Sequence, residues 1–329
     1  MKEMSLIFKR IFILIYLFFL LSLITYIFSF YSISKGKVYD VFWIKKIQEN
    51  LYWHGFIKSF PCNEHEPKLV YVPKEGKCRF KNTEFDTTLT FTKYFRKNQN
   101  NIKFNENLSA IAVLGDSVSM GWGVNDNQTY SSVLESNLKR KVYNFGVGGY
   151  GTHREILRFL NSPYYKSIDT VIIQYHMNDI DENYHFDEKK IYGKEYDFNS
   201  LMNIKEMSGT KKALFALRRF KSSFRMLYRE IKSMFYESEK LGFERHLNGI
   251  LKILKKYNYL DGKQIIIFYV NSHNIKFKDY EVKSYKNINF IDVNLVDKKH
   301  YFILDDHPNV NGHAELAKQL TEIIKTKKW

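Results

Sequence analysis

One stretch of the sequence decides the fold, Ala110-Ile111-Ala112-Val113-Leu114-Gly115-Asp116-Ser117. It opens with a short, uninterrupted apolar run, which is typical of a strand buried on both faces of a parallel sheet. The run ends abruptly at Gly115, and a serine follows two residues later. A serine in this position can act as an exposed nucleophile if a neighbouring imidazole accepts its proton. Alone, Gly115-Asp116-Ser117 is equally typical of a turn, because all three residues favour turns.

Strands and helices alternate on either side of this stretch, from Asn107 to the C-terminus. Such alternation is typical of a parallel sheet with helices on both faces, whose functional loops lie at the carboxyl ends of the strands. We therefore predict a three-layer α/β/α sandwich with a parallel sheet of about five strands in residues 108–329. The other strands are expected at 142–145, 170–175, 264–270 and 288–293, and the helices at about 129–138, from 152 onwards and at about 311–325.

The alternation stops in residues 181–256, where we predict a long helical insertion. Within it, Lys211–Tyr236 is rich in lysine and arginine, contains Glu230 as its one acid, and has apolar residues at helical spacing. This pattern predicts a basic amphipathic helix that packs on the core. A lid over the site and a helix on the membrane surface are the alternatives.

The N-terminal segment predicts a membrane anchor. Residues Ile11–Tyr31 are uncharged and follow Lys9 and Arg10. At about 1.5 Å per helical residue they can cross a hydrocarbon core of roughly 30 Å. The segment lacks the small-residue exit of a signal peptide, so we favour an uncleaved anchor over a cleaved signal. We predict a cytoplasmic N-terminus at 1–10, a single span of the inner (cytoplasmic) membrane at 11–31, and an extracytoplasmic, periplasmic main domain.

Residues 32–107 predict a linker and a small β-rich appendage. Tyr71-Val72-Pro73 and the alternating stretch 87–92 are typical of short strands. Cys62 and Cys78 are the only two cysteines in the sequence. In an exported protein such a pair favours a disulfide, and two unrelated free thiols are the alternative.

The composition excludes some classes of function. The formal net charge is +16, from 51 basic and 35 acidic residues. These basic residues are spread along the chain, with no zinc-finger spacing and no nucleic-acid-binding signature, so we predict no nucleic-acid partner. An anionic membrane surface or an acidic polysaccharide explains the sign of the charge equally well.

Four polar blocks fall at the predicted carboxyl ends of the strands. They are Gly115-Asp116-Ser117, the glycine-rich segment Asn144–Thr152, His176-Met177-Asn178-Asp179, and Asp305-Asp306-His307-Pro308-Asn309. Their order and spacing resemble the GDSL or SGNH hydrolase family of serine esterases and acyltransferases, over roughly Ile111–Ile324. The resemblance implies a flavodoxin-like SGNH hydrolase fold, interrupted here by the insertion.

The resemblance also implies roles for residues in these blocks. Ser117 is the expected nucleophile and His307 its base. The backbone N–H groups of Ser117 and Gly149 and the side-chain amide of Asn178 are the expected oxyanion hole, with Gly148 in place of Gly149 if the register differs by one residue. Each such donor is typically worth about 3 kcal/mol of transition-state stabilisation. The alternatives are a phosphate-binding glycine turn, although it lacks the ending of a P-loop, and a turn asparagine at 178.

The last block departs from the family pattern. The usual spacing, Asp-x-x-His, would need an acid at the position of Leu304. We predict that Asp305 orients His307, because residues two apart in an extended segment share a side, and Asp306 is the alternative acid. His313 is expected to be structural and His176 to line the pocket. No cofactor is predicted, and no metal, because the histidine has no partner at metal-binding spacing.

These features predict an enzyme that hydrolyses an ester, or transfers an acyl group, through an acyl-enzyme on Ser117. The family acts on acylated carbohydrates, lipids and simple esters, and an anchor beside the cell envelope favours acetyl groups on an envelope carbohydrate. A membrane acyltransferase is the candidate protein partner. The alternatives are a non-catalytic envelope protein that binds glycan with the same fold, and a membrane-surface adaptor that acts through Lys211–Tyr236.

Overall fold

The centre of the molecule is a five-stranded parallel sheet in the order β6-β5-β7-β8-β9. In chain order this is the doubly wound arrangement of flavodoxin-like folds, and it confirms the predicted α/β/α sandwich. The structure is a computed structural model that describes residues 2–58, 60–100, 102–105, 107–185, 219–220, 222, 225, 240–271 and 287–327. The strands are β5 (Ala110–Leu114), β6 (Val142–Asn144), β7 (Ile168–Tyr175), β8 (Gln264–Asn271) and β9 (Ile288–Asn294).

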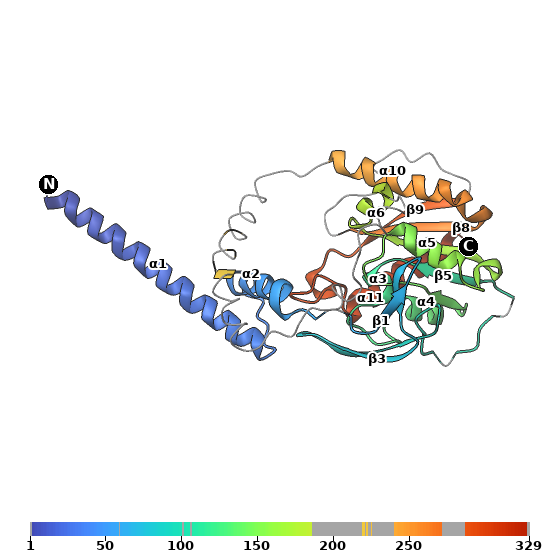
Figure 1. The fold of residues 1–329 in the computed structure, drawn as a ribbon, viewed down its shortest axis with the longest axis horizontal. Helices are drawn as coiled ribbons and strands as arrows, with labels where there is room; N and C mark the ends of the chain where they lie inside the picture. The colour runs from blue at the N-terminus through green and yellow to red at the C-terminus, as the bar shows by residue number, and fades with distance from the viewer. Residues whose placement is uncertain are drawn as a thin grey trace.

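Helices cover both faces of this sheet (Figure 1). Side chains alternate along each strand, so Ile111 and Val113 pack towards α4 and α11, whereas Ala112 and Leu114 pack towards α5 and α10. The result is two dry apolar layers that fix the carboxyl ends of the strands. Among the described residues, the helices of the domain are α3 (Ser117–Met120), α4 (Tyr130–Leu138), α5 (Thr152–Leu160), α6 (Asp179–His185), α10 (Lys240–Lys256) and α11 (Val310–Lys327), with short 3₁₀ turns at Tyr165–Ser167, Asn258–Gly262 and Lys298–His300.

Helix α10 lies within the range predicted as an insertion, yet it is part of the core. Leu247, Ile250 and Leu254 pack against the sheet beside α5. The helix therefore serves as the crossover between β7 and β8, as a parallel pair requires. The predicted basic helix at Lys211–Tyr236 lies outside the described residues, except for four of its positions.

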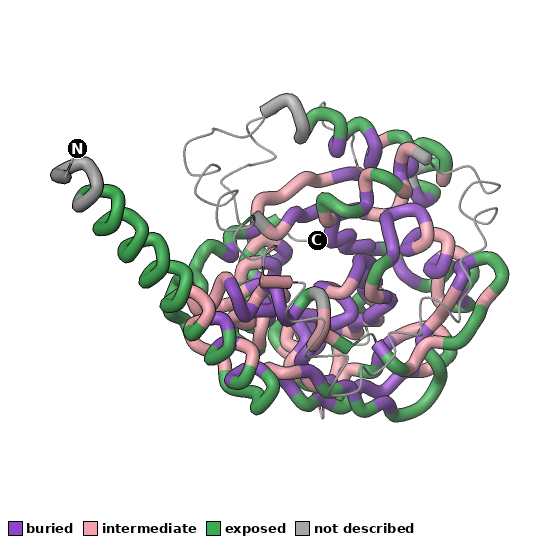
Figure 2. Tube along the Cα trace, turned by 60° about the vertical axis from the view of Figure 1, so that its left-hand side comes forward, coloured by how far each residue is buried: buried purple, intermediate pink, exposed green. Residues whose placement is uncertain are grey.

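The N-terminus forms a long helix, α1 (Lys2–Ser34), that projects from the domain and is exposed over most of its length (Figures 1 and 2). Its apolar part, Ile7–Ser34, is long and apolar enough to cross a membrane, a property that an anchor shares with a signal sequence. Only its last turns are buried, where Tyr26 and Ile33 contact the next helices. These are α2 (Phe42–Leu51) and a π-helical turn at Tyr52–Phe56.

Two antiparallel hairpins follow. The first pairs β1 (Asn63–Glu66) with β2 (Val70–Pro73), and the second pairs β3 (Gly76–Lys81) with β4 (Asp86–Phe91). The strands predicted near 71–73 and 87–92 are thus present. A disulfide joins Cys62 to Cys78 and ties the two hairpins together. The second hairpin meets the edge of the main sheet, because single bridges link Phe91 to Arg96 and Arg96 to Asn144.

Candidate active site

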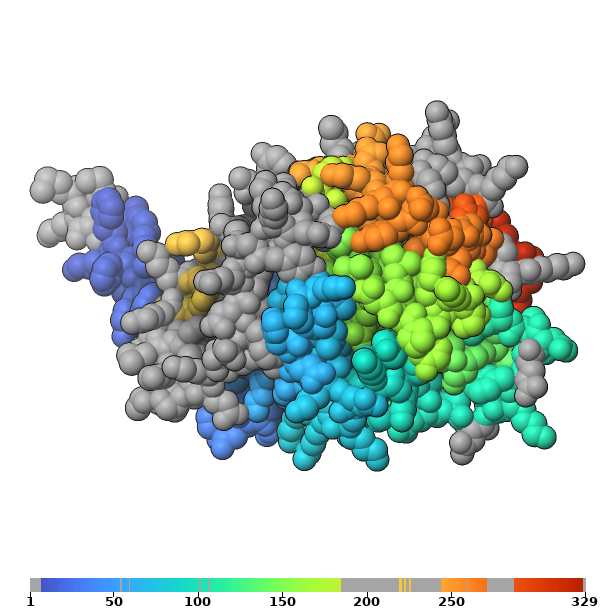
Figure 3. Space-filling view, turned by 45° about the vertical axis from the view of Figure 1, so that its right-hand side comes forward, coloured from blue at the N-terminus to red at the C-terminus, as the bar shows by residue number. Residues whose placement is uncertain are grey.

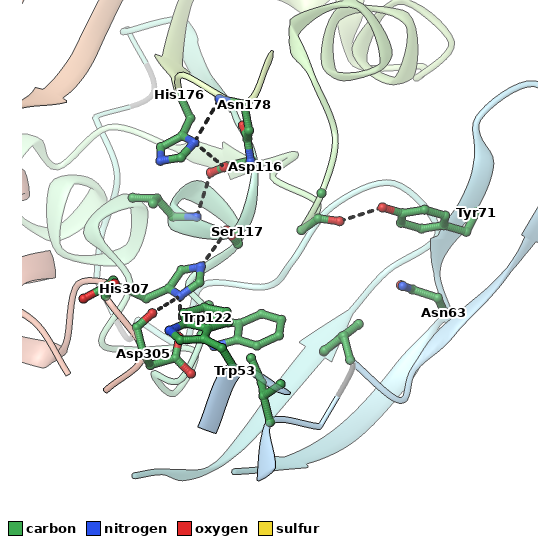
Figure 4. Close-up of a pocket in the computed structure, with 16 residues that line it drawn as sticks. Trp53, Asn63, Tyr71, Asp116, Ser117, Trp122, His176, Asn178, Asp305 and His307 are labelled. Carbon is green, nitrogen blue, oxygen red and sulfur yellow. Dashed lines mark hydrogen bonds and ion pairs between the residues drawn. The ribbon is translucent and has the colours of Figure 1, made fainter. Parts of the chain in front are cut away.

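The site lies where the strand order reverses, at the carboxyl ends of β5 and β7. Open α/β sheets bind ligands at this switch point, because neighbouring loops diverge there. A cavity of about 510 Å³ opens at this point. It is lined by Ser117 from the end of β5, by His176 and Asn178 from the end of β7, and by residues of the N-terminal segments (Figure 4).

Ser117 is the first residue of α3 and lies at the base of the cavity. The chain turns sharply before it, because Gly115 has φ +149° and a side chain there would collide with Ser119. The buried carboxylate of Asp116 accepts the N–H of Val118 at 2.9 Å and so caps α3. This cap leaves the hydroxyl of Ser117 facing the cavity.

His307 contacts the hydroxyl of Ser117. Its Nε2 lies 2.8 Å from Ser117 Oγ, and its Nδ1 lies 2.5 Å from Asp305 Oδ1 (Figure 4). The loop that carries His307 is closed by a bridge between Tyr301 and Pro308. The side chain of Asn309 then caps α11 by accepting the N–H of the residue two positions on, at 2.9 Å. The two stretches, far apart in the sequence, therefore meet with a hydrogen-bonded Ser–His–Asp chain.

The three residues before His307 point in different directions. Leu304 is fully buried in an apolar cluster with α1 and α2. Asp305 is also fully buried and faces the imidazole. Asp306 is exposed and has a left-handed backbone, with φ +55°. Asp305 therefore faces His307, as its spacing predicts. Leu304, one residue earlier, packs in the apolar cluster instead.

Two opposing effects act on the imidazole. Burial lowers the pKa of His307, but the hydrogen bond and the charge of Asp305 outweigh it, so the pKa is raised above its usual value. The indole of Trp122 stacks on the imidazole, with ring centroids 5.1 Å apart and planes at 20°. This contact limits rotation of the ring and keeps Nε2 directed at Ser117.

The glycine-rich turn forms one wall of the cavity. Gly149 has φ +79°, a conformation that favours glycine. The N–H of Gly148 donates to the sulfur of Met120 at 3.4 Å, whereas no acceptor among the described residues is found for the N–H of Gly149. The carbonyl of Gly148 accepts the hydroxyl of Tyr71 at 2.9 Å. Gly149 is therefore better placed than Gly148 to donate to an oxyanion.

The remaining polar residues predicted near the site lie in two environments. The exposed side chain of Asn178 and the imidazole of His176 both line the cavity. His176 Nδ1 lies 3.8 Å from Asp116 Oδ2. His313 lies in the core, where its Nδ1 accepts the N–H of Tyr130 at 3.2 Å and burial lowers its pKa to about 3. His313 is thus a structural residue.

Several residues of the site carried no signal in the sequence. The hydroxyl of Tyr52 donates to Asp305 Oδ2, although the two residues are 253 positions apart. The carboxylate of Glu84 accepts the N–H groups of Ile303 and Leu304 at 2.7 and 2.8 Å and holds the loop before Asp305. Within the part of the chain that the structure describes, no cluster of three or more His, Cys, Asp or Glu side chains suits a metal ion.

No protein-family model matches the sequence, and no curated protein matches it either. Solved structures that the chain matches include one described as a lipolytic protein of the G-D-S-L family from Desulfitobacterium hafniense DCB-2, at 15% identity over 66% of this chain and 99% of that chain, with a TM-score of 0.37.

Two further matches are named as esterases. A family two carbohydrate esterase from Clostridium thermocellum matches at 14% identity over 68% of this chain and 65% of that chain, with a TM-score of 0.37. A two-domain esterase active on acetylated mannans matches at 15% identity over 66% of this chain and 49% of that chain, also with a TM-score of 0.37.

Proposed function

We propose that this protein is a serine hydrolase of the SGNH type that cleaves an ester through an acyl-enzyme. One observation carries the proposal: His307 Nε2 lies 2.8 Å from Ser117 Oγ while its Nδ1 is held by Asp305. A general base within hydrogen-bond reach of a serine hydroxyl, itself oriented by a buried carboxylate, is the arrangement that activates serine. Ser117 and His307 meet in the site although they lie 190 positions apart in the sequence.

The reaction follows from this arrangement. Ser117 Oγ attacks the ester carbonyl and gives its proton to His307 Nε2, and Asp305 stabilises the imidazolium. The carbonyl oxygen becomes an oxyanion, which the N–H groups of Ser117 and Gly149 and the amide of Asn178 bind. The intermediate then expels the alcohol, which takes the proton from His307. Water, activated by the same imidazole, hydrolyses the acyl-enzyme to a carboxylic acid and restores Ser117.

For the substrate we propose an O-acetylated carbohydrate of the cell envelope. Aromatic side chains of Trp53, Phe60, Tyr71 and Trp122 line the cavity. Such rings offer apolar faces with polar edges, which suits the mixed surface of a sugar ring. Transfer of the acetyl group to a sugar hydroxyl uses the same acyl-enzyme, and a membrane acyltransferase partner would then supply the donor.

We further propose that α1 anchors the protein in the inner membrane, with the α/β domain in the periplasm. The length and apolar surface of α1 support this arrangement. The disulfide between Cys62 and Cys78 supports it independently, because disulfides persist in oxidising compartments. Residues 1–10 would then be cytoplasmic, 32–107 would connect the anchor at 11–31 to the domain, and the domain itself would span 108–329.

A panel of acyl esters tests the proposed function. The full chain in detergent should release acetate from acetylated sugars, and Ser117→Ala and His307→Ala should each lower kcat by a thousandfold or more, on the order expected for loss of a triad member. Added unacetylated glycan separates transfer from hydrolysis, since transfer yields an acetylated glycan. Equal turnover by all three proteins would refute the esterase. A glycan-binding protein without catalysis would bind the panel and release no acid.

A further inference from the structure

We propose that Tyr52 is a positioning residue of the active site, through which the N-terminal helices hold the acid that orients His307. The inference rests on the proposed function, because it assigns Asp305 that role. It places part of the catalytic machinery in the segment that joins α1 to the hairpins, outside the α/β domain.

Both oxygens of the Asp305 carboxylate are fixed. Oδ1 contacts His307 Nδ1 at 2.5 Å, and Oδ2 accepts the hydroxyl of Tyr52. Asp305 and Tyr52 are both fully buried. The terminal torsion of an aspartate is broad, so a carboxylate held at one oxygen can rotate out of the imidazole plane. The second hydrogen bond removes this freedom.

The hydroxyl of Tyr52 stays a hydrogen-bond donor throughout the pH range in which the enzyme would work. Burial, followed by the charge and hydrogen bond of Asp305, raises the pKa of Tyr52 far above its usual value. The phenol therefore stays neutral and donates a hydrogen bond to the carboxylate. A charge-assisted hydrogen bond of this kind is roughly twice as strong as one between neutral groups.

The local backbone explains how Tyr52 reaches Asp305. Helix α2 ends at Leu51 and continues as a π-helical turn over Tyr52–Phe56, closed by a hydrogen bond of 2.8 Å from the N–H of Ile57 to the carbonyl of Tyr52. Such turns redirect side chains and are frequent at functional sites. Here the turn directs Tyr52 to the acid, while the next residue, Trp53, lines the cavity.

The turn is held by the helices before it. Tyr26 and Ile33 of α1 and Ile47 and Leu51 of α2 form one apolar cluster with Tyr52 and Leu304. Leu304, which stands where the family pattern would have its acid, is thus the residue on which α1 and α2 pack. Because Leu304 directly precedes Asp305, this packing and the Tyr52 hydrogen bond locate the acid together.

A tyrosine that only filled the core would affect folding but not the proton affinity of His307. As a positioning residue, Tyr52 shares the negative charge of Asp305 with His307. Without the phenol donor, Asp305 stabilises the imidazolium more strongly, so the pKa of His307 should rise further. Among the described residues, charged and titratable groups near this pair include Asp116, Glu84, Asp306 and His313, with Lys45, Lys46 and Glu49 near Asp306.

The test uses the full chain in detergent, with Tyr52→Phe and the matched control Tyr165→Phe. Tyr165 also donates its hydroxyl to an aspartate, Asp261, but outside the residues that line the cavity. We expect Tyr52→Phe to lower kcat about tenfold with little change in KM, as loss of a hydrogen bond to a charged group would. The acid limb of kcat/KM should move to higher pH. Tyr165→Phe should match the wild type in both respects.

A nuclear magnetic resonance titration of the His307 ring supplies a readout that needs no turnover. Tyr52→Phe should raise its pKa, and 3,5-difluorotyrosine at position 52, a stronger donor that keeps the ring and the fold, should lower it. In an Asp305→Ala background, Tyr52→Phe should cause no further loss of kcat. If the wild type is active but neither change at position 52 shifts the pKa of His307, the role of Tyr52 is refuted and the esterase is not. An inactive wild type with the expected pKa shifts would refute the esterase and leave the Tyr52 contact standing.

Discussion

Two neighbouring residues, Asp305 and Asp306, are candidates for the acid that orients His307. Asp305 is buried and contacts His307 Nδ1, whereas Asp306 is exposed. An amide at position 305 would allow the wrong imidazole tautomer, so Asp305→Asn should lower kcat/KM by about a thousandfold or more. Asp306→Asn should stay within a few fold of the wild type. Steady-state kinetics on one ester decides between them, and a larger loss in the Asp306 variant would contradict the assignment.

The residues of the site differ in how far the sequence reveals them. Ser117 and His307 were predictable because each follows or precedes a recognisable element in a fixed pattern. The spacing of Asp305 favoured it over Asp306, and the structure has it facing His307. Tyr52 was not predictable, because its contact with Asp305 joins segments 253 residues apart and no local pattern encodes it.

Among the structural elements, the hairpin of β1 and β2 contacts the glycine-rich turn that forms one wall of the cavity. In Figure 3 this light-blue segment lies directly against the green segment that follows β6, and Leu69 packs with Val147 and Tyr150. The hydroxyl of Tyr71 fixes the carbonyl of Gly148. In a trans peptide the C=O and N–H point in opposite directions, so this bond directs the N–H of Gly149 away from Tyr71.

Removing that hydroxyl should therefore weaken the oxyanion hole. We expect Tyr71→Phe to lower kcat about tenfold, with KM nearly unchanged, because the peptide loses its fixed orientation but keeps its donor. Thermal unfolding should be almost unaffected, which separates this outcome from a folding defect. Turnover numbers equal to the wild type would show that the hairpin only covers the site.

The disulfide links the same hairpins. The bond from Cys62 to Cys78 closes a loop with a sequence separation of 16 residues. Loss of such a link typically costs about 3 kcal/mol. The double substitution Cys62→Ser, Cys78→Ser should therefore lower the free energy of urea unfolding by about that amount. A reducing agent should destabilise the wild type and leave the double variant unchanged. If the reducing agent left the free energy of unfolding of the wild type unchanged, the disulfide would be refuted.

The elements themselves were largely predictable from periodicity. Strands β5, β7 and β8 each contain a short apolar run, and α11 shows its apolar face at helical spacing, so the α/β domain followed from the sequence. Helix was predicted within residues 181–256, but the place of α10 in the core was not, because its contacts with the sheet join segments far apart in the sequence. Helix α2 is short and polar on one face, and its partners are α1 and the loop of Leu304.

For the molecule as a whole, a buried carboxyl group near the site should make stability depend on pH. Both carboxylate oxygens of Glu155 are buried without a hydrogen-bond partner among the described residues. Burial, followed by the charges of Asp179 and Asp116, raises the pKa of Glu155 well above its usual value. A raised folded-state pKa means that its contribution is retained below the unfolded-state pKa and is lost as pH rises through the folded-state value.

The free energy of unfolding should accordingly fall as pH rises above the ordinary carboxyl range. The isosteric change Glu155→Gln removes the titrating group, so it should flatten this slope and stabilise the protein at neutral pH by about 1 kcal/mol or more. Urea unfolding across a pH series measures both effects. The exposed Glu322 offers the control Glu322→Gln, which should leave the slope as it is. An unchanged slope in the Glu155 variant would mean that the pKa of Glu155 is not raised in the folded state.

Mass spectrometry of the protein mixed with an activated acetyl ester shows whether Ser117 carries the acyl group. We expect one acetyl group on the peptide that contains Ser117, formed rapidly in the wild type and hardly at all in His307→Ala. Acetylation elsewhere, or ester turnover that persists undiminished in Ser117→Ala, would contradict it.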